Sequence, residues 1–141
     1  MIRWLLALAA TGCIDAIAPD VGPIQSGSEQ TCNTDADPAI AVPYADVQQL
    51  FDDHCTRCHR PDGEGVQESG LDLTSYGALL EGGTRSVDTI VIAGEPCASV
   101  IFQKVTDAPP FGSRMPRGDR ALSAAEQQLL HDWISEGAVA P

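Results

Sequence analysis

Two cysteines and a histidine stand in the order Cys55-Thr56-Arg57-Cys58-His59, and this motif constrains the fold more than any other feature of the chain. Thiols three positions apart lie about one helical turn apart, so both can add to vinyl groups on one edge of a porphyrin. The imidazole of His59 then lies below the ring and is directed at the iron. The motif predicts one covalently bound haem c, with Cys55 and Cys58 as thioether positions and His59 as the proximal ligand.

Three other uses of the motif compete with haem attachment. A redox pair of the thioredoxin type would need a βαβ unit around Cys55, and the sequence there has no such pattern. A zinc site would need four closely spaced ligands, and no second pair of ligands accompanies Cys58 and His59. A structural disulfide between Cys55 and Cys58 is the least favoured alternative.

The second axial ligand is predicted by elimination. The chain has two methionines, and Met1 is expected to leave with an export signal, which leaves Met115. Pro116 favours an extended loop at Met115, and such a loop could bring the thioether to the open face of the iron. The alternative is that Met115 fills the core. Among the histidines, His54 is expected to be packed or hydrogen-bonded, and His131 to face water.

The first 43 residues carry targeting and linker signals. A positive start at Arg3 is followed by seven apolar residues, too few to span a bilayer of about 30 Å. The small residues before Cys13 resemble a bacterial lipobox, which implies a signal peptide of residues 1–12, cleavage before Cys13 and lipidation of this cysteine. Residues 13–43 are expected to form a flexible tether, and residues 44–141 the folded domain. We therefore expect a protein of the periplasm or cell envelope that is lipid-anchored to a bacterial membrane.

Cys32 and Cys97 remain after lipid and haem have taken three of the five cysteines. In an oxidising compartment two such thiols usually pair, so a Cys32–Cys97 disulfide is predicted, with two free thiols as the alternative. The bond would join the end of the tether to the domain.

The chain carries 20 acidic and 8 basic residues, a net charge of −12. This balance argues against nucleic acid as a partner. It fits a soluble, self-repelling surface and equally a face that attracts a basic redox partner, and composition does not separate these two interpretations.

The sequence predicts an all-α fold with long loops. One helix is expected to begin near Asp46 with a cap-like start and to lead into Cys55. The last helix is expected to begin with a capping box at Ser123 and Glu126 and to end near Gly137. Its apolar stripe comprises Leu129, Leu130, Trp133 and Ile134.

Weaker signals lie between these helices. Thr74 is a candidate cap for a short helix through Leu80, which Gly82 and Gly83 would end. Residues 87–93 are expected to be extended, and Ser99 could start another helical turn.

The order of these segments resembles a class I, mono-haem cytochrome c domain, and most resembles the planctomycete-type domains of bacterial exported proteins. The resemblance runs from Tyr44 to Ala138. Its parts are the CTRCH motif, the middle segment GLDLTSY, the Arg114-Met115-Pro116 loop and the last helix. It implies a compact helical fold with the first and last helices near the haem edge, and iron ligation by His59 and Met115.

The function expected from this resemblance is electron transfer rather than enzymatic catalysis, because a haem with both faces ligated has no free site for a substrate. The expected partners are redox donor and acceptor proteins, a membrane reached through the lipid anchor, and no nucleic acid, with the protein itself a monomer. A haem subunit of a larger periplasmic oxidoreductase, or a small haem peroxidase or sensor with an open distal site, are the alternatives.

Overall fold

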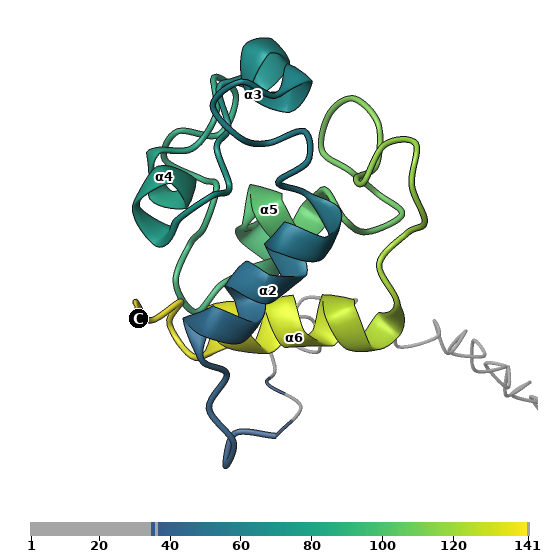
Figure 1. Ribbon diagram of the computed structural model, residues 1–141. Helices are drawn as coiled ribbons and strands as arrows, with labels where there is room; N and C mark the ends of the chain where they lie inside the picture. Colours follow the sequence, from purple (N-terminus) through teal and green to yellow (C-terminus); the bar gives the residue numbers. More distant parts are fainter. Residues whose placement is uncertain (1–34, 36, 141) are drawn as a thin grey trace, which may run out of the picture.

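The computed structural model describes residue 35 and residues 37–140, which form an all-α fold as the sequence predicts. The elements are α2 (Tyr44–His54), α3 (Glu64–Ser69), α4 (Tyr76–Glu81), the 3-10 helix η1 (Pro96–Ala98), α5 (Val100–Gln103) and α6 (Ala124–Ser135) (Figure 1). No strand occurs in this part of the chain. Within the same residues, no helix has both the length and the apolar character needed to cross a membrane.

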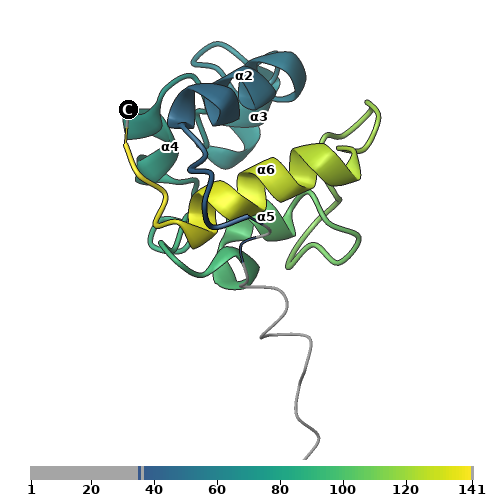
Figure 2. The ribbon, with the colours of Figure 1, turned by 90° about the horizontal axis from the view of Figure 1, so that it is seen from below.

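Helices α2 and α6 are the two longest, and they cross each other in contact (Figures 1 and 2). Each turns one apolar face to the other because its apolar residues recur at helical spacing. The buried residues at this crossing are Val47, Leu50 and Phe51 from α2, and Leu130, Trp133 and Ile134 from α6. Burying each of these large side chains contributes about 1.5–3 kcal/mol, so the crossing stabilises the fold.

The predicted capping box at the start of α6 is confirmed. The hydroxyl of Ser123 accepts from the backbone N–H of Glu126 at 3.3 Å, and the Glu126 carboxylate accepts from the backbone N–H of Ser123 at 2.6 Å. The helix ends with Glu136 as its C-cap, one residue earlier than expected, and Gly137 follows with a φ of 101°.

The starts of α2 and α4 differ from the prediction. Helix α2 begins at Tyr44, after Pro43, without a side-chain cap. The ring of Tyr44 is buried and packs 5.5 Å from that of Trp133, so tertiary packing adds a turn before Asp46. Helix α4 is capped by Ser75, whose hydroxyl accepts from Ala78, because the Thr74 hydroxyl donates to Asp72 instead.

Two features of the middle of the chain differ from the sequence prediction. Helix α3 was not predicted; it has no buried residue, so no apolar periodicity marks it. The segment 87–93 begins within a series of turns rather than as extended chain. Its Ile90 carbonyl accepts from the N–H of Ile101, and this bond fixes the start of α5 beside the segment.

Candidate functional site

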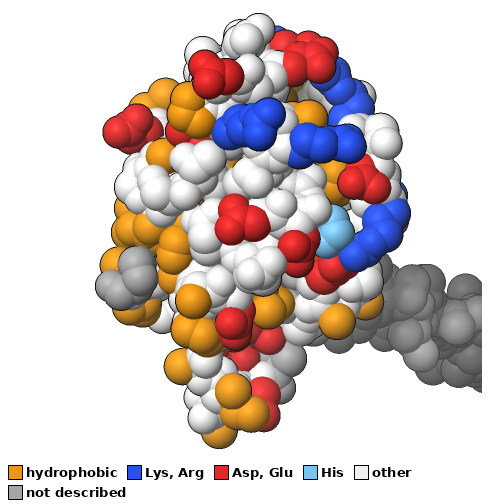
Figure 3. Space-filling view, in the orientation of Figure 1, with side chains coloured by type: hydrophobic (Ala, Val, Ile, Leu, Met, Phe, Trp, Pro, Cys, Tyr) orange, Lys and Arg blue, Asp and Glu red, His pale blue; other side chains and the backbone are white. Residues whose placement is uncertain are grey.

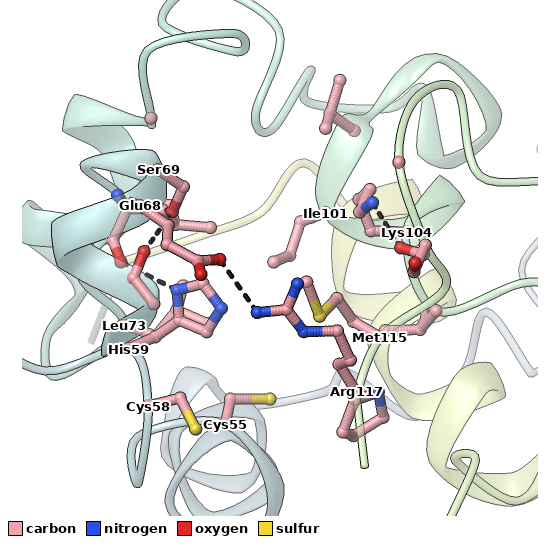
Figure 4. Close-up of a pocket in the computed structure, with 18 of the residues that line it drawn as sticks. Cys55, Cys58, His59, Glu68, Ser69, Leu73, Ile101, Lys104, Met115 and Arg117 are labelled. Carbon is pink, nitrogen blue, oxygen red and sulfur yellow. Dashed lines mark hydrogen bonds and ion pairs between the residues drawn. The ribbon is translucent and has the colours of Figure 1, made fainter. Parts of the chain in front are cut away.

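A cavity of about 620 Å³ opens between α2, α3, α5 and the loop that precedes α6 (Figure 4). Its size is that of a site for a cofactor or a large ligand. All four residues predicted to hold the haem line it: Cys55, Cys58, His59 and Met115. The apolar side chains that line it are Phe51, Leu71, Leu73, Ile90, Val100, Ile101, Val105, Phe111, Leu122 and Leu130. Apolar walls with two thiols, an imidazole and a thioether suit a porphyrin and its iron.

The two thiols are held at the C-terminal end of α2. Cys55 is its C-cap, and its N–H donates to the Phe51 carbonyl at 2.7 Å. The Cys55 carbonyl accepts from the N–H groups of Cys58 and His59 at 3.0 and 2.9 Å, so one tight turn holds the whole motif. Both thiols are free in the structure, and both line the cavity.

The electrostatics of Cys55 differ from those of a reactive redox cysteine. Burial, with a smaller effect from Cys58, raises the pKa of the Cys55 thiol to about 12. Thioredoxin-type cysteines have a lowered pKa and lie at helix N-termini, where the helix dipole stabilises a thiolate. Cys55 lies at a helix C-terminus in an apolar wall, so its surroundings do not favour thiol–disulfide exchange.

The imidazole of His59 is held at two points. Its Nδ1 lies 2.9 Å from the carbonyl oxygen of Leu71. Because a carbonyl only accepts, Nδ1 carries the proton, and the lone pair of Nε2 is left for a metal. A Cβ at Gly65 would lie only 2.9 Å from Cε1 and 3.0 Å from Nδ1 of His59, so only glycine fits there.

Met115 lies on the opposite wall from His59, and both side chains point into the cavity (Figure 4). The Met115 N–H donates to the Lys104 carbonyl at 2.7 Å, and the peptide bond to Pro116 is cis. Met115 lines the cavity and is not a residue of the hydrophobic core between α2 and α6, and its ligation of iron stays a prediction.

An ion pair joins the two walls. Arg117, two residues after Met115, donates to Glu68 of α3 at 2.9 Å, and its side chain passes between His59 and Met115 in Figure 4. The side chains are 55% and 52% exposed, so the pair contributes at most about 1 kcal/mol. It opposes the entry of a flat cofactor only weakly.

His54 is hydrogen-bonded, as predicted. Its Nε2 lies 2.9 Å from the Glu126 carboxylate, which also accepts from Arg120 at 2.7 and 2.9 Å. This network joins the end of α2 to the start of α6 at the edge of the cavity. The prediction for His131 is wrong: it is 6% exposed, and its ring packs 5.4 Å from that of Phe102, because α5 covers that side of α6.

Three residues that shape the site were missed in the sequence. Gly65 and the carbonyl of Leu71 hold His59, and Lys104 holds the backbone of Met115. The GLDLTSY segment, in which Leu71 lies, carried part of the family resemblance, but nothing in it indicated a contact with His59. No local signal marks Lys104, since its contacts are with residues seven to eleven positions away.

Several predictions lie outside the described residues: the signal peptide, lipidation of Cys13, most of the tether, and Cys32. Cys97, within η1, is disulfide-bonded in the structure, and its pairing with Cys32 stays a prediction. In the part of the chain that the structure covers, no cluster of three or more His, Cys, Asp or Glu side chains is arranged to hold a metal ion.

Comparison with known proteins gives one family. A family model described as planctomycete cytochrome C matches residues 55–119, from the first cysteine of the motif to just beyond Met115 and Arg117. No curated protein and no solved structure matches the chain. The matched segment includes Cys55, Cys58, His59 and Met115, the four residues brought together by the cavity. The match supports a cytochrome c-type domain in the chain, which suggests a haem-binding, electron-transfer role and implies covalently bound haem c.

Proposed function

We propose that the protein is a mono-haem electron carrier whose iron is ligated by His59 and Met115. One observation carries this proposal: the imidazole of His59, with Nδ1 bound to Leu71, and the thioether of Met115 lie on opposite walls of one cavity that both cysteines also line. The bound group supplies reversible one-electron chemistry at its iron. The residues of the chain attach it, orient it and exclude water from it.

The proposal includes the absence of enzymatic activity. With His59 on one face and Met115 on the other, no coordination position is left for peroxide or another substrate. The apolar lining of the cavity would keep bulk water away from the iron, which favours electron exchange at an exposed edge over chemistry at the metal. A chain with one CxxCH motif would hold one haem.

The proposed redox partner presents acidic groups at the contact. Of the eight basic residues, only Arg3 lies outside the described part, and four of the other seven line the cavity: Arg57, Arg85, Lys104 and Arg117. The remaining three, Arg60, Arg114 and Arg120, are sequence neighbours of lining residues. Figure 3 shows one face of the molecule, on which Lys and Arg side chains gather in the upper right, whereas acidic side chains are spread over the whole face. This distribution favours an acidic partner face over the basic partner that net charge alone suggested.

The proposed location is the outer side of a bacterial membrane, with the protein a lipid-anchored monomer. This rests on the residues that precede the domain: the positive start, the short apolar run and the small residues before Cys13. The length of chain between Cys13 and α2 would let the domain reach partners beyond the lipid headgroups.

The test is an optical spectrum of the protein matured with haem-attachment machinery. We expect one haem by mass that resists acid-acetone extraction, and a sulfur-to-iron charge-transfer band in the ferric state. Met115→Leu, which conserves volume, should lose this band and let the ferrous haem bind carbon monoxide, whereas His54→Gln should keep the band. A wild-type protein without the band that binds carbon monoxide would contradict the proposal and favour the peroxidase or sensor alternative.

A further inference from the structure

One side chain holds the segment that carries Met115. The ammonium of Lys104 donates to the backbone carbonyls of Phe111 and Ser113, each at 2.6 Å. The carbonyl of the same lysine accepts from the Met115 N–H at 2.7 Å. The ammonium also lies 4.9 Å from the centre of the Phe111 ring. Lys104 thus contacts three of the five residues from 111 to 115.

These bonds have no substitute elsewhere. Residues 111–115 form no helix, and Gly112 has a left-handed φ of 57°. Among the described residues, every hydrogen bond that this segment makes outside residues 107–119 goes to Lys104. Arg114 pairs with Asp107, but both residues lie in the same loop, so this ion pair does not attach the loop to the core. A segment with so few anchors would otherwise populate several conformations.

Lys104 itself is well anchored. It follows α5 directly, and its N–H donates to the Val100 carbonyl at 2.9 Å. Val100 and Ile101 are buried, and their N–H groups donate to Thr89 and Ile90 at 2.9 and 3.0 Å. Lys104 therefore attaches the loop to the core at a fixed position.

We infer that Lys104 is a positioning residue that fixes the Met115 thioether at the distal side of the haem; this rests on the proposed ligation by Met115. A thioether is a weak neutral ligand, so its occupancy depends on how narrowly the protein restricts its position. Without the ammonium, the segment keeps one of its three bonds to Lys104, and Met115 samples positions away from the iron. The distal coordination site then opens although the ligand is still in the sequence.

The experiment compares three variants of the haem-loaded full chain. Lys104→Gln removes the ammonium, Lys104→Arg keeps a cation with several donors, and Arg85→Gln is the matched control. Arg85 also lines the cavity and lies over the Phe111 ring, at 5.5 Å, but has no hydrogen bond to the loop. Arg85→Gln removes a positive charge from the cavity and from the Phe111 ring, whereas Lys104→Gln also removes the hydrogen bonds to the loop. The comparison therefore separates the effect of the charge from that of the hydrogen bonds.

For Lys104→Gln we expect unchanged haem attachment by mass, a sulfur-to-iron band lost at a temperature where the helices are still folded, and carbon monoxide binding to the ferrous protein about tenfold faster. Lys104→Arg should largely restore the wild-type values, and Arg85→Gln should retain them. The inference is overturned if the wild type shows the band and Lys104→Gln keeps it, or loses it only together with the helical signal.

Hydrogen exchange separates this inference from the ligation on which it rests. If the wild type lacks the band, ligation by Met115 fails, and the positioning of an iron ligand fails with it. The attachment of the loop is then measured directly: amides of residues 112–115 should exchange about tenfold faster in Lys104→Gln than in Arg85→Gln. Equal exchange in these two variants would show that Lys104 does not hold the segment at all.

Discussion

The ring nitrogen Nδ1 of His59 lies 2.9 Å from the backbone carbonyl oxygen of Leu71, twelve positions further along the chain. A second hydrogen bond joins the same two segments, because the His59 carbonyl accepts from the N–H of Leu73 at 2.9 Å. The 71–73 segment therefore fixes both the backbone and the ring of His59. Since both partners in that segment are main-chain groups, no side-chain substitution there removes them directly, and the orientation of the imidazole is best tested at another neighbour of the ring, Gly65.

Gly65→Ala tests how the imidazole of His59 is held. The new Cβ would lie 2.9 Å from both the Cys58 carbonyl oxygen and Cε1 of His59, and 3.0 Å from Nδ1. The Cys58 backbone cannot move without shifting the motif, so the imidazole has to tilt. We expect a loss of about 1–3 kcal/mol in the free energy of unfolding, measured with urea, and a shifted reduction potential.

Gly77→Ala is the control for this substitution. A Cβ there meets no atom within 4 Å, and the residue lies in α4. Better helix propensity should stabilise this variant by up to about 1 kcal/mol and leave the potential unchanged. Equal unfolding midpoints for the two alanine variants would mean that Gly65 does not support His59.

Glu126 makes the junction of α2 and α6 sensitive to acid. The hydrogen bond from Arg120, and then those from Ser123 and His54, hold the pKa of the Glu126 carboxyl well below its ordinary value. A lowered folded-state pKa stabilises the fold at neutral pH, and this contribution is lost as the pH falls below about 4.3, the ordinary pKa of glutamate. We expect Glu126→Gln to lower the free energy of unfolding by about 1 kcal/mol at pH 7.

The difference between wild type and Glu126→Gln should shrink as the pH is lowered from 5 towards 2, followed by urea unfolding at each pH. Asp88→Asn provides the comparison, since Asp88 is exposed and forms no ion pair with any residue that the structure describes. A stability difference that stays constant down to the lowest pH would show that the carboxylate charge at position 126 has no part in the junction.

The success of the sequence prediction depended on whether a signal was local. The capping box at Ser123 and the apolar stripe of α6 are complete within one helix, and both were predicted correctly. His131 lies on the same helix, but its burial depends on α5, which packs on α6 from over twenty residues earlier. No periodicity within α6 records that contact.

The site shows the same difference between local sequence signals and contacts made by distant segments. Cys55, Cys58 and His59 are adjacent in sequence, and Met115 was found because only two methionines exist. The groups that hold His59 and Met115 are main-chain atoms of Leu71 and a lysine outside the motif. A backbone carbonyl has the same chemistry at every residue, so its role becomes visible only when the fold places it beside a ring.

Cys97 allows a covalent prediction. It is a disulfide cysteine, and we expect its partner to be Cys32, 65 positions earlier. A digest of the alkylated, unreduced protein should yield one linked pair of peptides that contain these two residues. Cys97→Ser should free one thiol and lower the free energy of unfolding by up to about 4 kcal/mol, the loop-closure estimate. Linkage of Cys97 to Cys13 would contradict both the pairing and the lipidation.

The basic residues around the cavity predict a salt dependence that opposes the net charge. At an ionic strength near 0.1 M, charges act over about 10 Å, so a small reagent at the cavity senses the nearby arginines more than distant acids. We expect the ferrous protein to react more slowly with ferricyanide as salt is added. Replacing both Arg57 and Arg60 with Gln should slow this reaction about two- to fivefold. Both side chains are exposed, and neither forms an ion pair within the described residues.

A cationic oxidant and a distant acid complete this test. With tris(phenanthroline)cobalt(III), the double variant should react slightly faster than the wild type. Asp46→Asn, at the end of α2 remote from Cys55, should change neither rate, because its charge is screened from the cavity. If added salt instead accelerates the reaction with ferricyanide, and the double variant reacts as the wild type does, the acidic residues make the electrostatic potential at the cavity negative. The partner would then have to present a basic face, as the net charge of −12 suggests on its own.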